Sequence, residues 1–258
     1  MIQEIRIKNY LSFRDEVVLS FEATKDTTFE ECQVVNVTPK VRLLRFALIY
    51  GANASGKSNL LNAMDFLRDF WFDKKSDIDE ETGVVPFLLD TETPNEPSEF
   101  NIKFFVGDKR YWYALVLDDK QVIKEDLYVY NSVQPSLVFS RELDGTASLI
   151  KLNASLVKAN ATIVEQLNVK CLSNMSFFAA RNQVNCSLAY IDEVRDWMKN
   201  NMMPIIEPGT RMFEYAGKQM EKNAELKAYI LDFVHKADYN TVSYTHLRAH
   251  DTGRNLVC

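Results

Sequence analysis

Long apolar runs, cysteine, glycine and histidine are all scarce in this chain of 258 residues, which has four cysteines, eight glycines and three histidines. No apolar run approaches the roughly 18 residues of a membrane-spanning helix. Residues 1–13 alternate charged with apolar side chains instead of forming an apolar signal core. We therefore expect a soluble, cytoplasmic protein that does not enter a membrane. The cysteines are spaced too widely and irregularly for a disulfide framework or a zinc site, and we expect all of them to be reduced: Cys32, Cys171, Cys186 and Cys258.

The charge balance is slightly acidic, with 30 Lys and Arg residues against 36 Asp and Glu residues and a net charge of −6. This balance argues against a surface that binds nucleic acid over its whole area, because such binding requires clustered cations. A local basic groove stays open. With 47% apolar and 26% charged residues, the chain is expected to be globular, with one large domain or two small ones.

The hydrophobic pattern of the first third predicts strands followed by a helix. Residues 2–7 and 17–21 alternate as two strands joined by a short turn, and the apolar run Leu43–Tyr50 suits a buried strand of a parallel sheet. From Lys57 the apolar residues recur every three or four positions, which predicts a helix that ends near Lys74.

The middle and the end of the chain alternate between strand and helix patterns. Residues 100–139 are rich in aromatic and alternating segments separated by turn-forming residues, which predicts an antiparallel meander. The pattern from 149 to 172 predicts helix, and Ser187 is the expected N-cap of a helix that carries Leu188 to Met198. A last helix is expected around residues 226–234.

Residues 51–58 read GANASGKS, a full match to the phosphate-binding motif G-x-x-x-x-G-K-[ST], between a predicted strand and a predicted helix. Gly51 and Gly56 allow the backbone to curl so that its amides face phosphate oxygens. The positive end of the following helix points to the same oxygens. Lys57 is the expected catalytic cation at the β- and γ-phosphates, and Ser58 is the expected Mg²⁺ ligand. The predicted contacts to ATP in this region are Gly51, Ala52, Asn53, Ala54, Ser55, Gly56, Lys57, Ser58 and Asn59.

Three strings together resemble a known family: residues 2–13 (I-x-x-I-x-I-K-N-Y-L-S-F), a second strand VVLSFEA, and LLRFALIYGANASGKSNLLNAM. They resemble the head domains of ABC-type ATPases related to SMC and RecF proteins. They are most similar to the bacterial AAA family ATPases found beside OLD-like nucleases and abortive-infection systems. The resemblance is close over residues 1–72 and looser to about residue 240.

The resemblance implies an α/β fold: an incomplete P-loop NTPase head of the ABC type with an antiparallel β-rich arm and a helical segment. We expect an N-terminal lobe over residues 1–75, the arm over 76–148 and the helical segment over 149–240, which leads to a missing second half of the ATPase. Residues 241–258 lose all periodicity and are expected to be a tail foreign to the protein. His246 and His250 in that tail are not expected to bind a metal.

Later motifs of such heads, the Walker B strand, the signature loop and the switch histidine, are expected to lie beyond this fragment. Residues 115–119 (LVLDD) are expected to form a hairpin turn, and 188–193 (LAYIDE) a helix whose carboxylates face water. The string EPGTR at 207–211 comes too early for a signature loop. Gln183 is a candidate for the glutamine that senses Mg²⁺ and the γ-phosphate, the other interpretation being a surface amide.

The function expected from motif and resemblance is ATP binding with Mg²⁺, and ATP hydrolysis in an intact, head-to-head homodimer. A nuclease or toxin partner is expected, and nucleic acid stays open. The fragment itself should bind ATP weakly and hydrolyse it negligibly. One alternative is a P-loop kinase for a small molecule, with Asp118 or Asp192 as its carboxylate; a GTPase is disfavoured because no N-K-x-D string occurs. The other is a nucleotide-switched interaction module, favoured if the meander exposes its four tyrosines: Tyr111, Tyr113, Tyr128 and Tyr130.

Overall fold

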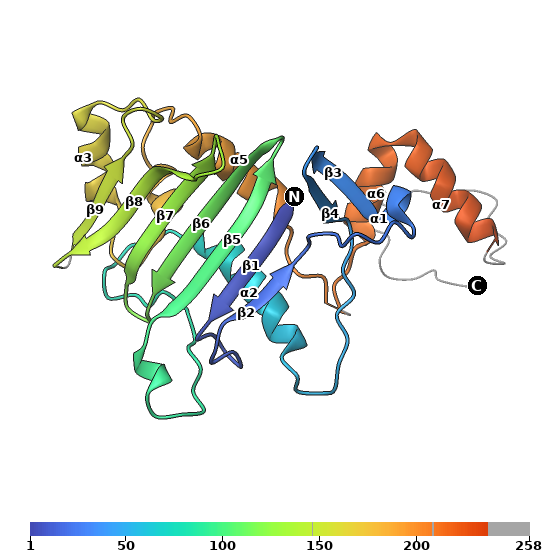
Figure 1. Cartoon of the computed structure of the whole chain (residues 1–258), viewed down its shortest axis with the longest axis horizontal. Coiled ribbons are helices and arrows are strands. Elements are labelled where there is room, and N and C mark those ends of the chain that lie inside the picture. Colours follow the sequence, from blue (N-terminus) through green and yellow to red (C-terminus); the bar gives the residue numbers. More distant parts are fainter. Residues whose placement is uncertain (146, 208, 237–258) are drawn as a thin grey trace, which may run out of the picture. The chain divides into compact units, whose positions relative to one another are not determined.

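The computed structural model describes residues 1–145, 147–207 and 209–236. Contacts divide the chain into a large unit, residues 1–205, and a second unit that begins at Ile206. The large unit combines a mostly antiparallel sheet with several helices, a mixed α/β fold compatible with a P-loop NTPase-like domain (Figure 1).

A seven-stranded sheet organises the large unit, in the order β2-β1-β5-β6-β7-β8-β9, with every neighbouring pair antiparallel. The two predicted N-terminal strands and the predicted meander are therefore confirmed. The strands are β1 (Ile2–Lys8), β2 (Val17–Ser20), β5 (Ser98–Val106), β6 (Lys109–Leu117), β7 (Val122–Tyr130), β8 (Ser136–Asp144) and β9 (Ala147–Leu152). β1, from the predicted N-terminal lobe, pairs with β5, from the predicted arm, so these two segments share one sheet.

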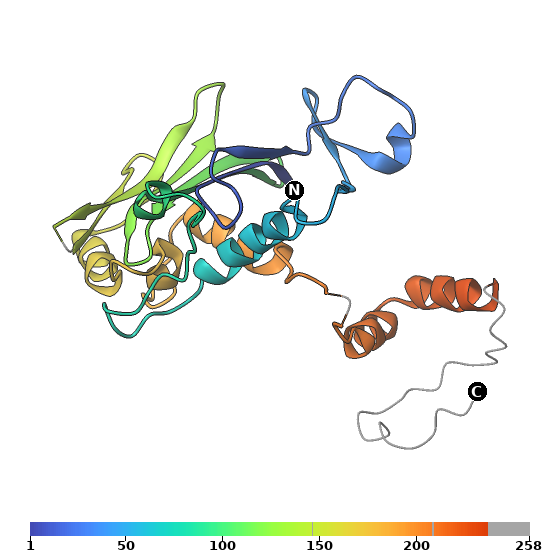
Figure 2. The same cartoon turned by 90° about the horizontal axis from the view of Figure 1, so that it is seen from below.

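One face of this sheet is the core, and helices cover it (Figure 2). Alternation along the strands sends Ile5 and Ile7 of β1, and Phe100 and Ile102 of β5, into a continuous apolar cluster with the helices. The opposite face carries ion pairs such as that between Glu4 and Lys103. The helical elements of the large unit are α1 (Glu30–Gln33), α2 (Lys57–Phe70), the 3₁₀ turn η1 (Thr93–Asn95), α3 (Ala161–Lys170), α4 (Phe177–Arg181) and α5 (Ile191–Asn201).

The predicted buried strand over residues 43–50 is wrong. The strand there, β4 (Val41–Leu44), ends early and pairs antiparallel with β3 (Val34–Thr38) in a separate two-stranded sheet. Residues 45–50 have no regular structure, and Phe46, Leu48 and Tyr50 are 69, 73 and 87% exposed. An apolar run of this kind is normally buried by neighbours on both faces, and the described residues place no strand beside it.

Two helix predictions also need correction. Residues 149–152 belong to strand β9, because Ile150 faces the core while Leu149 is exposed, and helix starts only at α3. Ser187 does not cap α5; the helix is preceded by Tyr190, which adopts φ 64°. The helix predicted from Lys57 is confirmed as α2, although it ends at Phe70 instead of near Lys74.

The second unit contains two helices, α6 (Phe213–Lys222) and α7 (Ala224–Lys236). The α7 helix confirms the prediction from the spacing of apolar residues at 226–234. Within α6, Gly217 and Met220 are buried. The tail predicted to be foreign, 241–258, with His246 and His250, lies outside the described residues.

Candidate nucleotide-binding site

The phosphate-binding motif forms an exposed loop that enters helix α2, as the sequence predicts. Residues 51–55 are exposed, and Ala54 and Gly56 adopt positive φ angles of 63° and 86°. A Cβ on Gly51 would lie 3.1 Å from Ser55 Oγ, so the missing side chain leaves the inside of the loop free. The loop is therefore neither packed shut nor covered.

The amides of this loop are available to a ligand. Within the described residues, Ser55 N, which donates to Ala52 O at 3.3 Å, is the one amide of residues 52–59 that has a hydrogen-bond acceptor. Unsatisfied amides that converge at a helix start bind anions. The geometry therefore provides the donors that a polyphosphate needs.

The partial positive charge at the start of α2 is not compensated by a side chain, in contrast to the starts of α3 and α4. Gly56 precedes it without any capping side chain, and its first turn contains no acidic residue. By comparison, α3 is capped by Asn160 and α4 by Ser176, whose side chains accept from Ile163 N and Ala179 N. The positive end of the α2 dipole thus has no negative partner of its own, which favours an anionic ligand.

The two side chains of the motif that are predicted to contact the phosphates and Mg²⁺, Lys57 and Ser58, lie at the first two positions of α2. Lys57 Nζ donates to Gly51 O at 2.9 Å, to Ala52 O at 2.7 Å and more weakly to Ser55 Oγ at 3.4 Å. The ammonium group is therefore held over the loop by loop oxygens. Ser58 is exposed, so that its hydroxyl is accessible to a cation.

A support for this loop that the sequence reasoning missed comes from the turn between β1 and β2. Ser12 Oγ accepts a hydrogen bond from Asn59 Nδ2 at 2.8 Å, and the Phe13 ring lies against Gly56. Tyr10 OH donates to Asn62 O at 3.3 Å. Burial, with a smaller contribution from Asp65, raises the pKa of Tyr10 to about 12. The only sequence signal for these contacts is the string Y-L-S-F at residues 10–13, which is part of the resemblance to the ATPase heads.

Two predicted ligand contacts have local partners. The Asn59 amide is engaged by Ser12, as described above, and so faces the turn. Gln183 lies just after α4, and its side-chain amide donates to Ala179 O at 3.4 Å within its own turn. Ser176, at the start of α4, donates to Trp71 O, which follows the C-terminal end of α2. The structure thus ties the segment before Gln183 to the opposite end of the helix from the phosphate-binding loop.

The carboxylates that resemble a Walker B motif are engaged elsewhere. Asp118 Oδ1 accepts from Lys120 N and Gln121 N, both at 2.8 Å, in the β6–β7 turn, which confirms the predicted hairpin. The expectation that the carboxylates of α5 face water is wrong. Asp192 pairs with Arg181 at 2.7 Å, and Glu193 accepts from Lys109 at 2.8 Å, because cations from neighbouring segments reach this helix start.

The four tyrosines of the meander do not form one exposed patch. Tyr111 and Tyr113 are fully buried, whereas Tyr128 and Tyr130 are half-buried on the other face of the sheet. There Tyr128 stacks on Trp112 with centroids 4.6 Å apart, and the Arg110 guanidinium lies 4.4 Å from the Tyr130 ring centre. Two of the four tyrosines, Tyr111 and Tyr113, are therefore part of the core.

Among the described residues, the remaining sequence candidates form no second site. Glu207 O accepts a hydrogen bond from Thr210 N at 2.9 Å within the second unit. Within the described residues no cluster of histidine, cysteine or acidic side chains could hold a metal, and Cys32, Cys171 and Cys186 are free thiols. No helix among the residues described is long and apolar enough to cross a membrane.

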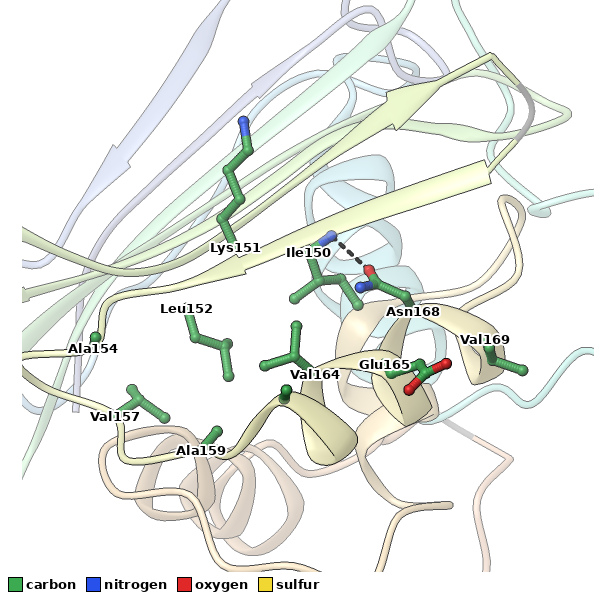
Figure 3. Close-up of a pocket in the computed structure, with 11 residues that line it drawn as sticks. Ile150, Lys151, Leu152, Ala154, Val157, Ala159, Val164, Glu165, Asn168 and Val169 are labelled. Carbon is green, nitrogen blue, oxygen red and sulfur yellow. Dashed lines mark hydrogen bonds between the residues drawn. The ribbon is translucent and has the colours of Figure 1, made fainter.

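A groove of about 750 Å³ lies away from the motif, between strand β9 and helix α3 (Figure 3). Its lining is mostly aliphatic; Figure 3 shows Ile150, Leu152 and Val164 pointing toward one another and Lys151 pointing away from them. Ile150 N donates to Asn168 Oδ1 at 2.8 Å, so α3 satisfies this amide of the edge strand. The groove has no set of phosphate-binding donors like that of residues 51–58.

The family model described as "AAA domain, putative AbiEii toxin, Type IV TA system" matches residues 46–151. This match supports an AAA-type P-loop ATPase. The matched segment begins inside the exposed run before the loop and continues through α2 into β9. The family suggests nucleotide binding and ATPase activity in general. Neither a search of curated proteins nor one of solved structures found a match to the chain.

Proposed function

We propose that this AAA-type domain binds Mg²⁺-ATP through residues 51–58, as part of an ATPase head of the ABC type. The observation that carries the proposal is the exposed loop whose amides lack internal acceptors, at the start of a helix with neither cap nor acid. A helix start left in this state is costly unless water or a ligand satisfies it.

The residues present fit a bound triphosphate. The amides of residues 53, 54 and 56–58 would donate hydrogen bonds to the phosphate oxygens, and Lys57, already at the mouth of the loop, would exchange its carbonyl acceptors for phosphate. Ser58 would hold Mg²⁺ through its exposed hydroxyl. Mg²⁺ bound there neutralises phosphate charge. These groups bind and orient the nucleotide, and Lys57 is the one positioned to stabilise charge during transfer.

Turnover needs a group that orients the attacking water. The carboxylates that resemble Walker B residues are held by other partners, Asp118 by its own turn and Asp192 by Arg181. We therefore infer that this chain alone hydrolyses ATP negligibly and that hydrolysis occurs when two heads associate. A steady-state ATPase rate that Lys57→Ala abolishes would refute this part of the proposal.

Calorimetric titration with ATP, with and without Mg²⁺, tests the binding proposal. Lys57→Ala should weaken ATP binding by about 10- to 100-fold, the range expected for one charge-assisted contact. Ser58→Ala should remove the gain in affinity that Mg²⁺ provides. The matched control is Lys120→Ala, an exposed lysine in the β6–β7 turn. Equal ATP affinity in the wild type and Lys57→Ala, or no binding at millimolar ATP, would contradict the proposal.

A further inference from the structure

The turn between β1 and β2 is fixed by hydrogen bonds within itself and to residues 85–96. Tyr10 N and Phe13 N donate to each other's carbonyl oxygens at 2.9 and 2.8 Å. Asn9 Nδ2 donates to Thr93 O and Glu96 O, both at 2.8 Å, and Leu11 N donates to Val85 O at 2.9 Å. Asn9 and Leu11 both adopt left-handed backbone angles, which persist only where the surroundings determine them.

The same turn also contacts the start of α2 at three positions spaced three residues apart, beginning with Gly56, which precedes the helix. Phe13 lies against Gly56, Ser12 accepts from Asn59, and Tyr10 donates to the carbonyl of residue 62. Residues at this spacing share one face of a helix. The turn therefore docks along the first two turns of α2, next to the free amides.

The loop has few ties of its own. Besides the Ser55 N to Ala52 O bond, they are the bonds from Lys57 Nζ to Gly51 O, Ala52 O and Ser55 Oγ. When Lys57 turns to the phosphates, its three hydrogen bonds to the loop are lost. The contacts of Ser12 and Phe13 with the helix start do not involve Lys57, and they stay available in the bound state.

We propose that Ser12 and Phe13 are positioning residues of the phosphate-binding loop. This inference rests on the proposed ATP binding. Phe13 occupies the space beside Gly56 and Ser12 orients Asn59, so together they keep the left-handed turn at Gly56 and aim the amides of residues 56–58 at the nucleotide. The turn presents this surface already formed, which lowers the ordering cost of binding.

The experiment measures ATP affinity at a temperature where thermal unfolding shows each variant to be folded. Ser12→Ala should weaken ATP binding by about three- to tenfold, as for loss of one hydrogen bond, and Ser12→Thr should restore it. Phe13→Ala should weaken ATP binding by about tenfold or more. If Phe13→Ala does not fold, Phe13→Leu takes its place and should keep most of the affinity. Ser132→Ala, in the exposed β7–β8 turn, is the control.

A double-mutant cycle separates positioning from general stability. If Ser12 acts through Asn59, the variant with both Ser12→Ala and Asn59→Ala should bind ATP no more weakly than either single variant. Additive losses, or a Ser12→Ala variant with wild-type affinity, would overturn the proposal. If the wild type binds ATP and binding depends on Lys57 but not on Ser12 or Phe13, only the positioning role is refuted. If the wild type does not bind ATP, both the ATP site and the positioning role are refuted.

Discussion

Arg141 on β8 and Glu125 on β7 lie opposite each other in the sheet and form an ion pair of 3.1 Å with both side chains fully buried. Glu125 also accepts from Tyr113 OH at 2.9 Å and from Phe177 N at 2.8 Å. Burial raises the pKa of the Glu125 carboxyl, and Arg141 opposes this rise. Arg141 further donates to Leu172 O at 2.8 Å. The pair thus fastens the segment before α4 to the middle of the sheet.

Removing one member of this pair should be strongly destabilising, because the other charge stays buried without its partner. We expect Arg141→Met to lower the free energy of unfolding by about 3–5 kcal/mol. The variant with both Arg141→Met and Glu125→Leu should recover part of this loss, as neither charge remains. Urea unfolding of the two variants measures the difference. A loss below about 1 kcal/mol in Arg141→Met would show that the pair does not hold the segment.

We expect that Gly56 cannot be replaced, because of its backbone angle and because the space beside its Cα is occupied by the turn between β1 and β2. An alanine there would adopt φ near 86° and place its Cβ 3.0 Å from both Phe13 Cε1 and Ser12 Oγ. We expect Gly56→Ala to cost about 2–4 kcal/mol of unfolding free energy and to abolish measurable ATP binding.

Gly83 provides the matched control for this substitution. Its φ of 83° is nearly the same, but no atom lies within 4 Å of its would-be Cβ. Gly83→Ala should therefore cost about 1–2 kcal/mol from backbone strain alone and leave ATP affinity unchanged. Equal effects of the two substitutions would mean that the turn does not confine Gly56.

The sequence predicted most accurately those features whose geometry is decided locally. Strict alternation identified β5 to β8, and the motif at 51–58 identified the loop because its glycine and its helix start impose their own backbone shape. The segment 45–50 was misjudged for the opposite reason. An apolar run shows that a segment requires burial, but not which neighbour provides it.

The missed parts of the site depend on contacts between distant segments. Ser12 and Asn59 are 47 residues apart, and nothing in the periodicity of either segment relates them. Similarly, Lys109 and Glu193 are 84 residues apart, which is why the α5 carboxylates were expected to face water. Strand β9 was read as helix because six residues are too few to separate the two patterns.

The exposed run before the loop should govern association of the isolated chain. Because Leu48 is 73% exposed, Leu48→Lys should change the free energy of unfolding by no more than about 0.5 kcal/mol. It should also reduce self-association, since it interrupts an exposed apolar segment. Light scattering across a concentration series and urea unfolding test both.

Leu43→Lys is the contrast: that side chain is fully buried, and the substitution should lower the free energy of unfolding by several kcal/mol. If Leu48→Lys self-associates as strongly as the wild type, the exposed run is not the surface through which the chain associates.

The outer face of the sheet should contribute to stability in a pH-dependent way through Glu4. Arg6 at 2.8 Å and Lys103 of the neighbouring strand at 2.9 Å both donate to its carboxylate. The hydrogen bond from Arg6, followed by that from Lys103, lowers the pKa of Glu4 below its ordinary value of 4.5. Because the folded pKa is the lower one, the contribution is fully present above pH 4.5 and is lost as the pH falls through the folded pKa.

Urea unfolding of wild type and Glu4→Gln between pH 3 and 7 measures this contribution. We expect a constant difference of about 0.5–1 kcal/mol in unfolding free energy at the upper end of that range, the size typical of partly exposed pairs. It should shrink below pH 4.5, where the wild-type carboxylate takes up a proton. In a background with both Arg6→Gln and Lys103→Gln, the same substitution should have little effect at any pH, because the donors that favour the carboxylate are gone. A difference that persists to pH 3, or one unaffected by loss of both cations, would place the effect of Glu4 in packing instead of charge.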